Sequence, residues 1–206
     1  MGKRNGNGSD RARQMVAQEA ARIIVNQGIR DYRAAKLKAA ERLGMSSRGS
    51  LPNNAEIEQA LGEHHQLFGG DSHADLLRSA REAALSAMQM LETFEPRLVG
   101  PVLNGTADAN SAVNLHVFAD SPETVAMQLE SLAVSYRPYE RRLRRNREVT
   151  ETYAGFEFRH ESADVQATVF PVDGIRQAPL SPVDGKPMQR ADAARVRSML
   201  DGANAP

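Results

Sequence analysis

The segment Leu98–Phe118 contains the residues whose types and spacing come closest to a reaction centre. Asp108 lies in a polar stretch, and Asn114 and His116 follow in a run that alternates polar and apolar side chains. This alternation predicts a strand over 112–118, on which residues two apart point to the same face. Ala112, Asn114 and His116 would therefore share a face. Carboxylate and imidazole groups can transfer protons. Both, and the oxygen of an amide, can bind a divalent cation.

A second group that could do chemistry is a cluster of five arginines within seven positions: Arg141, Arg142, Arg144, Arg145 and Arg147. On a strand, 141, 145 and 147 would lie on one face and the other two on the opposite face. A single anion-binding face would then hold three of them. The cluster is the best candidate for contacting a nucleotide phosphate or an RNA backbone. The alternative is a charged edge strand that resists aggregation.

The segment around Asn114 reads L-V-G-P-V-L-N-G-T-A-D-A-N-S-A-V-N-L-H-V-F. It resembles the signature G-S-x-x-x-G-x-x-x-x-x-S-D-x-D-L of the polymerase-beta-like nucleotidyltransferases. Gly100, Gly105, Ser111 and Leu115 match this signature without a gap. The resemblance spans residues 85–170. It implies a nucleotidyltransferase-like sheet domain, with Gly100, Gly105 and Ser111 close to the bound ligand.

The chain departs from this family at the residues that carry its chemistry. The two carboxylates that would bind Mg²⁺ are replaced by Ala112 and Asn114, and Pro101 replaces a phosphate-binding serine. A third carboxylate usually comes from a later strand, and Asp164 or Gln166 occupies that neighbourhood. The resemblance therefore implies a binding or regulatory module for a nucleotide or protein partner, with no metal and no cofactor.

The alternative hypothesis is an active, Mg²⁺-dependent nucleotidyltransferase with a rebuilt site. Asp108, His116 and Asp164 are its candidate catalytic residues. A single histidine on a strand is more often a buried, hydrogen-bonded residue than a ligand, so the binding module remains the leading interpretation.

Three further runs are similar to those of uncharacterised proteobacterial nucleotidyltransferase-like proteins: R-L-V-G-P-V-L-x-G-T-A, L-H-x-F-A-D and Q-A-P-L-x-P-V-D-G-x-P-M. Proteins of that group are sometimes labelled UDP-N-acetylmuramate–alanine ligase. Such a ligase needs a G-x-x-G-K-[ST] phosphate loop, which this sequence lacks. The ligase interpretation is therefore rejected.

The formal net charge is zero, but the charges are segregated along the chain. Residues 1–50 carry 11 basic and 4 acidic side chains, whereas residues 51–136 carry 3 and 12. A third hypothesis is therefore DNA or RNA binding through residues 3–48, whose helical pattern resembles the start of a TetR-type helix-turn-helix domain. The loop with Pro52 that follows argues against a recognition helix and favours an ordinary helical hairpin.

Composition narrows the class of protein further. The absence of cysteine excludes disulfide bonds, thiol nucleophiles and thiolate metal sites. No stretch approaches the ~18 consecutive apolar residues of a membrane helix, and the basic start has no apolar region of the kind found in secretory signals. We therefore expect a cytoplasmic protein with no membrane partner.

The helices and strands expected from the sequence pattern together indicate an α+β fold. An N-terminal helical segment is followed by a mixed sheet with helices on one face. Helices are expected over 10–28, 31–43 and 53–68 and from Ser72 towards Pro96, then another from Ser121 and a last one over 191–200. Strands are expected over 98–103, 112–118, 136–145, 152–160 and 163–170. The predicted organisation is a disordered tail (1–9), a helical region (10–96), a nucleotidyltransferase-like domain (97–175) and a turn-rich tail with a C-terminal helix (176–206).

Overall fold

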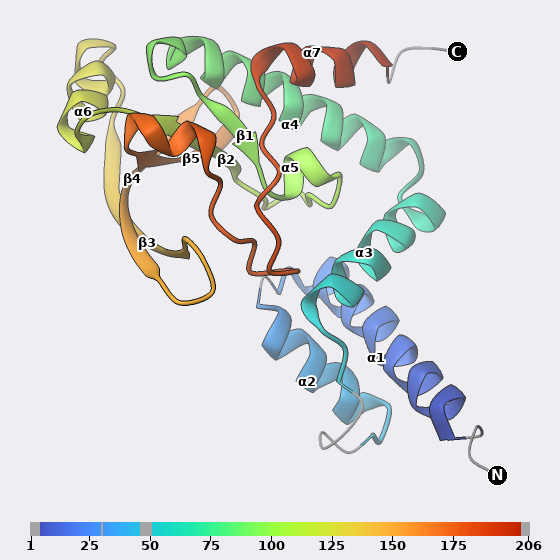
Figure 1. The fold of residues 1–206 in the computed structure, drawn as a ribbon. Helices are drawn as coiled ribbons and strands as arrows, with labels where there is room; N and C mark the ends of the chain where they lie inside the picture. Colours follow the sequence, from blue (N-terminus) through green and yellow to red (C-terminus); the bar gives the residue numbers. More distant parts are fainter. Residues whose placement is uncertain (1–4, 30, 46–50, 203–206) are drawn as a thin grey trace. The chain divides into compact units, whose positions relative to one another are not determined.

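A computed structural model describes residues 5–29, 31–45 and 51–202, which form an α+β fold (Figure 1). Four helices come first: α1 Asn5–Gln27, α2 Tyr32–Arg42, α3 Asn54–Phe68 and α4 Gly70–Met90. The strands are β1 Arg97–Val99, β2 Val113–Phe118, β3 Tyr136–Arg144, β4 Thr150–His160 and β5 Ala163–Phe170. Shorter helices are α5 Pro101–Asn104, α6 Pro122–Ser131 and α7 Ala193–Gly202, with 3₁₀ turns at Glu92–Phe94 and Val172–Arg176. The predicted α+β class is confirmed.

The chain divides into two compact units, and the boundary differs from the predicted one at residue 96. The first unit contains residues 1–73 and 182–184, and the second contains residues 74–181 and 185–206. Nearly all of α4 belongs to the second unit because Ala84, Ala87 and Met88 are buried in the core of the sheet. The C-terminal tail joins the same core through Val196 of α7.

The first unit is a small helical assembly in which α1 packs against both α2 and α3. Its core is rich in alanine, with Ala20, Ala21, Ala35 and Ala39 fully buried beside Ile57. Small side chains let helices approach closely. Helix α1 begins at Asn5, inside the segment 1–9 that was expected to be disordered, while residues 1–4 of that segment lie outside the described residues.

A capping box begins helix α3. The Asn53 side chain accepts a hydrogen bond from the Glu56 backbone N–H at 2.9 Å, and the Glu56 carboxylate accepts one from the Asn53 N–H at 2.7 Å. We expect Asn53→Ala to lower the free energy of unfolding by about 1 kcal/mol, because the Glu56 backbone N–H loses its acceptor. Urea denaturation followed by circular dichroism measures this loss. Asn53→Asp keeps the cap and should lose much less, so an equal loss in both variants would contradict the assignment.

The second unit is built on a five-stranded sheet of order β1-β2-β5-β4-β3. Strands β2 and β5 are parallel, and the other neighbouring pairs are antiparallel. One face carries Val113, Leu115 and Val117 of β2 and packs against α4, α6 and α7. The opposite face, here called the polar face, carries Asn114 beside Gln166 and His116 beside Thr168.

The strand predicted over 98–103 is wrong in its second half. Strand β1 ends at Val99, Gly100 turns the chain with a φ of 74°, and Pro101 is the first residue of α5. A positive φ favours glycine, and proline suits the first position of a helix because its missing N–H has no helical partner there. The chain therefore runs strand, short helix and strand between residues 97 and 118.

The segment that follows β5 connects the two edges of the sheet. The Leu180 N–H donates to the Arg144 carbonyl of β3 at 2.7 Å, and Ala191 exchanges two backbone hydrogen bonds with Leu98 of β1. Strands β1 and β3 are the two edge strands. Residues 177–181 and 185–191, here called the strap, thereby bring Arg190 to the polar face.

Candidate functional site: the polar face of the sheet

Arg141 holds together two amide side chains of the polar face. Its Nη1 donates to Asn114 Oδ1 at 3.2 Å, and its Nη2 donates to Gln166 Oε1 at 2.6 Å. Asn114 and Gln166 are cross-strand neighbours on the parallel pair β2 and β5. Both acceptors are neutral amide oxygens, so the bonds fix the guanidinium without neutralising its charge.

A glycine allows strand β3 to reach this position across β4. Gly155 of β4 pairs with Tyr139 on one side and Thr168 on the other. A Cβ atom at Gly155 would lie 2.3 Å from Tyr139 Cζ, so the tyrosine ring fits only over a residue without a side chain. The Tyr139 hydroxyl hydrogen-bonds to the Thr168 hydroxyl at 2.8 Å, and Arg141 stacks on the same ring with 5.4 Å between the guanidinium carbon and the ring centroid.

A second arginine, Arg190 of the strap, contacts the same face. Its Nε donates to His116 Nδ1 at 3.0 Å, and its Nη1 donates to the Gly174 carbonyl at 2.8 Å. The guanidinium lies about equally far, 5.0 and 5.1 Å, from the ring centroids of Phe118 and Phe170. Burial, and next the nearby Arg97, lower the pKa of Arg190 to about 10, which still leaves it charged at neutral pH.

His116 is fully buried between the two arginines. Burial lowers its pKa well below the ordinary value, and Arg190 and then Arg141 add to that effect. Because Nδ1 accepts from Arg190, the neutral ring carries its proton on Nε2. Within the described part of the chain, His116 Nε2 and Arg190 Nη2 are buried N–H donors without a hydrogen-bond partner. Each of these donors could bond to an oxygen atom of a ligand or water.

The electrostatic balance of this face is positive. Among the described residues, neither Arg141 nor Arg190 forms an ion pair with a carboxylate. Glu157 of β4 is an acid on the same face, in register with Gln166 across the ladder. Half-buried guanidinium groups held only by neutral acceptors retain their attraction for an anion.

Of the glycine and serine positions of the matched signature, Gly100 is the one that lies beside Asn114. A Cβ atom at Gly100 would lie 3.5 Å from Asn114 Nδ2, so the turn before α5 passes directly beside the amide. Ser111 Oγ donates to Asp108 Oδ1 at 2.8 Å and closes the loop before β2. Gly105 ends α5 with a φ of 80°. Asp108 is thereby engaged in a local turn.

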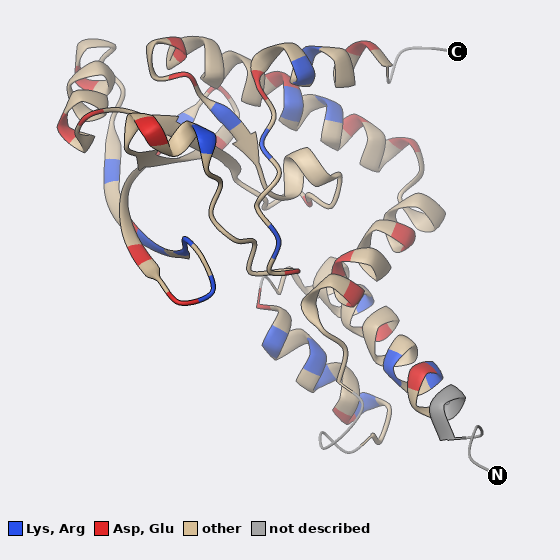
Figure 2. Cartoon of the chain, in the orientation of Figure 1, with Lys and Arg blue, Asp and Glu red and all other residues tan. Residues whose placement is uncertain are grey.

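The other arginines of the cluster do not join Arg141. Arg142 and Arg144 lie on the opposite face of β3 and are exposed. Strand β3 ends at Arg144, so Arg145 lies in the turn after the strand, where it pairs with Glu151 at 3.1 Å. Figure 2 shows basic positions, coloured blue, along the β3–β4 hairpin and its turn. Of the four arginines proposed as anion contacts, Arg141 is the one that contacts a residue of the matched signature, Asn114.

The candidate residues of the rebuilt catalytic site have separate partners. Asp108 is bonded to Ser111, His116 to Arg190, and the exposed Asp164 to Arg159 at 3.3 Å. The residues that the structure describes contain no group of three or more His, Asp or Glu side chains placed to hold a metal ion. Ala112, at the start of the same segment, supplies only its backbone carbonyl, which accepts from Asn114 Nδ2 at 3.1 Å.

Several basic residues of the N-terminal helices have partners within their own unit. Lys36 donates to the Pro52 carbonyl and to Asn54, and Lys38 donates to Gln27. Arg42 pairs with Glu19 at 3.1 Å. Arg30 and residues 46–50, which also belong to the basic segment, lie outside the described residues.

Sequence reasoning missed the two residues that complete the polar face, Tyr139 and Arg190. The run Q-A-P-L-S-P-V-D-G-K-P-M-Q-R that ends in Arg190 was interpreted only as turn-rich. No local pattern indicates that its last arginine returns to a strand 74 residues earlier. Pro101 and the flanking glycines carried a usable signal for α5, because proline at the first position and glycine after the last are typical of a short helix.

A comparison with models of known protein families gives no match, and a comparison with curated proteins gives none either. Over the ranges that the structure describes, no helix combines the length and the apolar character required to cross a bilayer.

Proposed function

We propose that this chain is a nucleotidyltransferase-like protein that binds an anionic, phosphate-bearing ligand, such as a nucleotide, without transferring it. Arg141 carries the proposal. In the matched signature, Asn114 stands where a metal-binding acid is expected and Gln166 lies beside it. A guanidinium bonded to both amides supplies at this point the positive charge that a metal supplies in an active nucleotidyltransferase.

The chemistry of the polar face favours binding over catalysis. A guanidinium can bind phosphate oxygens through its remaining N–H groups, but it cannot activate a hydroxyl nucleophile as a metal ion does. The signature positions offer an alanine and an amide where two carboxylates would be needed, and Asp108 is bonded within its own loop. The orphaned donors on His116 and Arg190 add capacity for further oxygen acceptors.

Calorimetric titration of the full chain with ATP, ADP and inorganic pyrophosphate tests the proposal, each in EDTA and in Mg²⁺. We expect binding in EDTA, because the positive charge is part of the protein. Arg141→Ala should weaken it at least about tenfold, since a charge-assisted bidentate contact is lost. Arg142→Ala, on the opposite face of the same strand, is the matched control and should bind like the wild type.

Glu157→Gln provides a test in the opposite direction. Glu157 is in register with Gln166 on the polar face. Removing its negative charge should strengthen anion binding, because the local charge becomes more positive. Binding that strictly requires Mg²⁺, or an Arg141→Ala variant that binds normally, would exclude the proposed site. A clear Mg²⁺-dependent and Asn114-dependent incorporation of a labelled nucleoside triphosphate would show that the chain is an active enzyme.

A further inference from the structure

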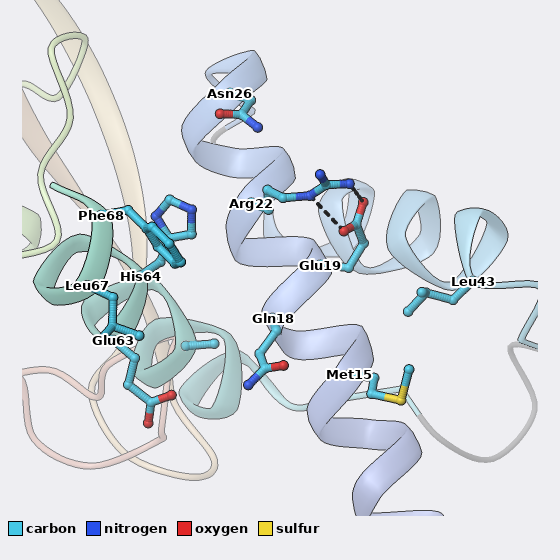
Figure 3. A pocket seen from close by; sticks show the side chains of 11 residues that line it. Met15, Gln18, Glu19, Arg22, Asn26, Leu43, Glu63, His64, Leu67 and Phe68 are labelled. Atoms are coloured by element: carbon cyan, nitrogen blue, oxygen red, sulfur yellow. Dashed lines mark hydrogen bonds and ion pairs between the residues drawn. The ribbon is translucent and has the colours of Figure 1, made fainter.

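The first unit presents a groove on its surface that the proposed ligand site does not use. It has a volume of about 690 Å³ and is lined by one stripe of side chains from α1 and one from α3, with Leu43 at one end (Figure 3). Residues 15, 18, 22 and 26 of α1 and residues 60, 63, 64 and 67 of α3 recur at helical spacing. Two parallel stripes of this kind form the surface into which further helices pack in a bundle.

Large apolar side chains at the groove are exposed to solvent. Leu67 is 75% exposed, Phe68 74% and Met15 44%. Figure 3 shows Leu67 and Phe68 projecting from α3 beside His64, whose ring lies 5.0 Å from that of Phe68. Exposed aromatic and methionine side chains gathered at one groove are typical of a protein interface.

Two copies of this groove could face each other with opposite charges in contact. Glu19 of α1 is paired with Arg22, which also lines the groove, and with Arg42 of α2, so this cluster of three side chains carries one excess positive charge. On the other wall, the Glu63 carboxylate accepts a hydrogen bond from Gln59 and has no ion pair among the described residues. If a two-fold axis through the groove brings Arg22 of one copy against Glu63 of the other, the same contact forms a second time on the opposite side of the axis.

We infer that the occupant of this groove is a second copy of the chain. Helices α1 and α3 of two copies pack as a four-helix bundle, with Leu67, Phe68 and Met15 as apolar anchors and with two Arg22–Glu63 ion pairs across the axis. This association does not depend on ligand binding at the polar face.

Light scattering coupled to size-exclusion chromatography, from about 1 μM to about 1 mM, tests the inference over the range in which interfaces of modest size associate. We expect a monomer–dimer equilibrium for the wild type. Phe68→Gln should weaken dimerisation at least about tenfold through loss of an apolar anchor. Leu37→Gln is the matched control, because Leu37 is an apolar residue of α2, 44% exposed, that does not line the groove.

A charge reversal tests whether Arg22 of one copy faces Glu63 of the other. It remains informative if the Phe68 variant does not fold. Glu63→Arg should weaken the dimer, and Arg22→Glu added to it should restore the dimer. A wild type that is monomeric at every concentration would overturn the inference and assign the groove to another occupant. A dimer that is insensitive to Phe68→Gln and to Glu63→Arg would also overturn it, since association would then use another surface.

Discussion

Acidification is expected to destabilise the sheet unit through His116. The histidine is buried between Arg190 and Arg141, and its Nδ1 accepts a hydrogen bond from the Arg190 guanidinium. Burial and the two charges lower its pKa in the folded state, so the unfolded chain binds a proton more readily than the folded chain. Stability from this residue is complete above the unfolded pKa of about 6.5 and is lost as the pH falls below it, at up to about 1.4 kcal/mol per pH unit.

This loss accumulates as the pH falls from 7 towards 5. Urea denaturation at a series of pH values measures it, and His116→Asn separates it from other titrating groups. An asparagine oxygen can accept from Arg190 in place of Nδ1 but does not titrate. The wild type should therefore lose more stability on acidification than the variant. Parallel curves would show that the folded protein accommodates a protonated His116.

The buried histidine and its two arginines illustrate what local sequence can predict. The alternation over 112–118 predicts correctly that Asn114 and His116 share a face, and the structure places both on the polar face. The period of two also places Arg141 opposite Arg142 and Arg144. These conclusions need only the geometry of one strand.

The partners of these residues depend on contacts between distant segments, which no local period encodes. Arg141 meets Asn114 across 27 residues of sequence, and it reaches across β4 only because Gly155 leaves space for Tyr139. Arg190 returns through the strap, whose backbone bonds connect both sheet edges. For the same reason the boundary predicted at residue 96 differs from the observed one at residue 73. The helical pattern of α4 does not indicate which of the two cores the helix joins.

The two arginines of the polar face are held by different kinds of contact. Arg141 is half-buried and bonded to two neutral amide oxygens, so its remaining N–H groups can donate to an anion. Arg190 is fixed by two backbone carbonyls, a histidine and two aromatic rings, and it supplies a constant positive field. We therefore expect Arg141 to determine affinity and Arg190 to maintain the geometry of the face.

Restoring the two missing carboxylates is expected to abolish anion binding and, by itself, not to create a metal site. In Ala112→Asp/Asn114→Asp, the new acids lie beside Arg141, which already donates to the side chain at position 114. The guanidinium would form ion pairs with them, its charge would be neutralised, and anion affinity should fall at least about tenfold. A divalent cation would have to enter against a fixed positive charge a few ångströms away.

Removing Arg141 in the same background should allow that cation to bind. We expect Mn²⁺ binding, measured by electron paramagnetic resonance, in Ala112→Asp/Asn114→Asp/Arg141→Ala and little in the double variant. Arg142→Ala in place of Arg141→Ala is the control and should leave Mn²⁺ unbound, because Arg142 lies on the opposite face of β3. Equal Mn²⁺ binding by the double and triple variants would show that Arg141 does not occupy the place of a metal. Failure of the triple variant to bind Mn²⁺ would show that positions 112 and 114 cannot form a cation site in this fold.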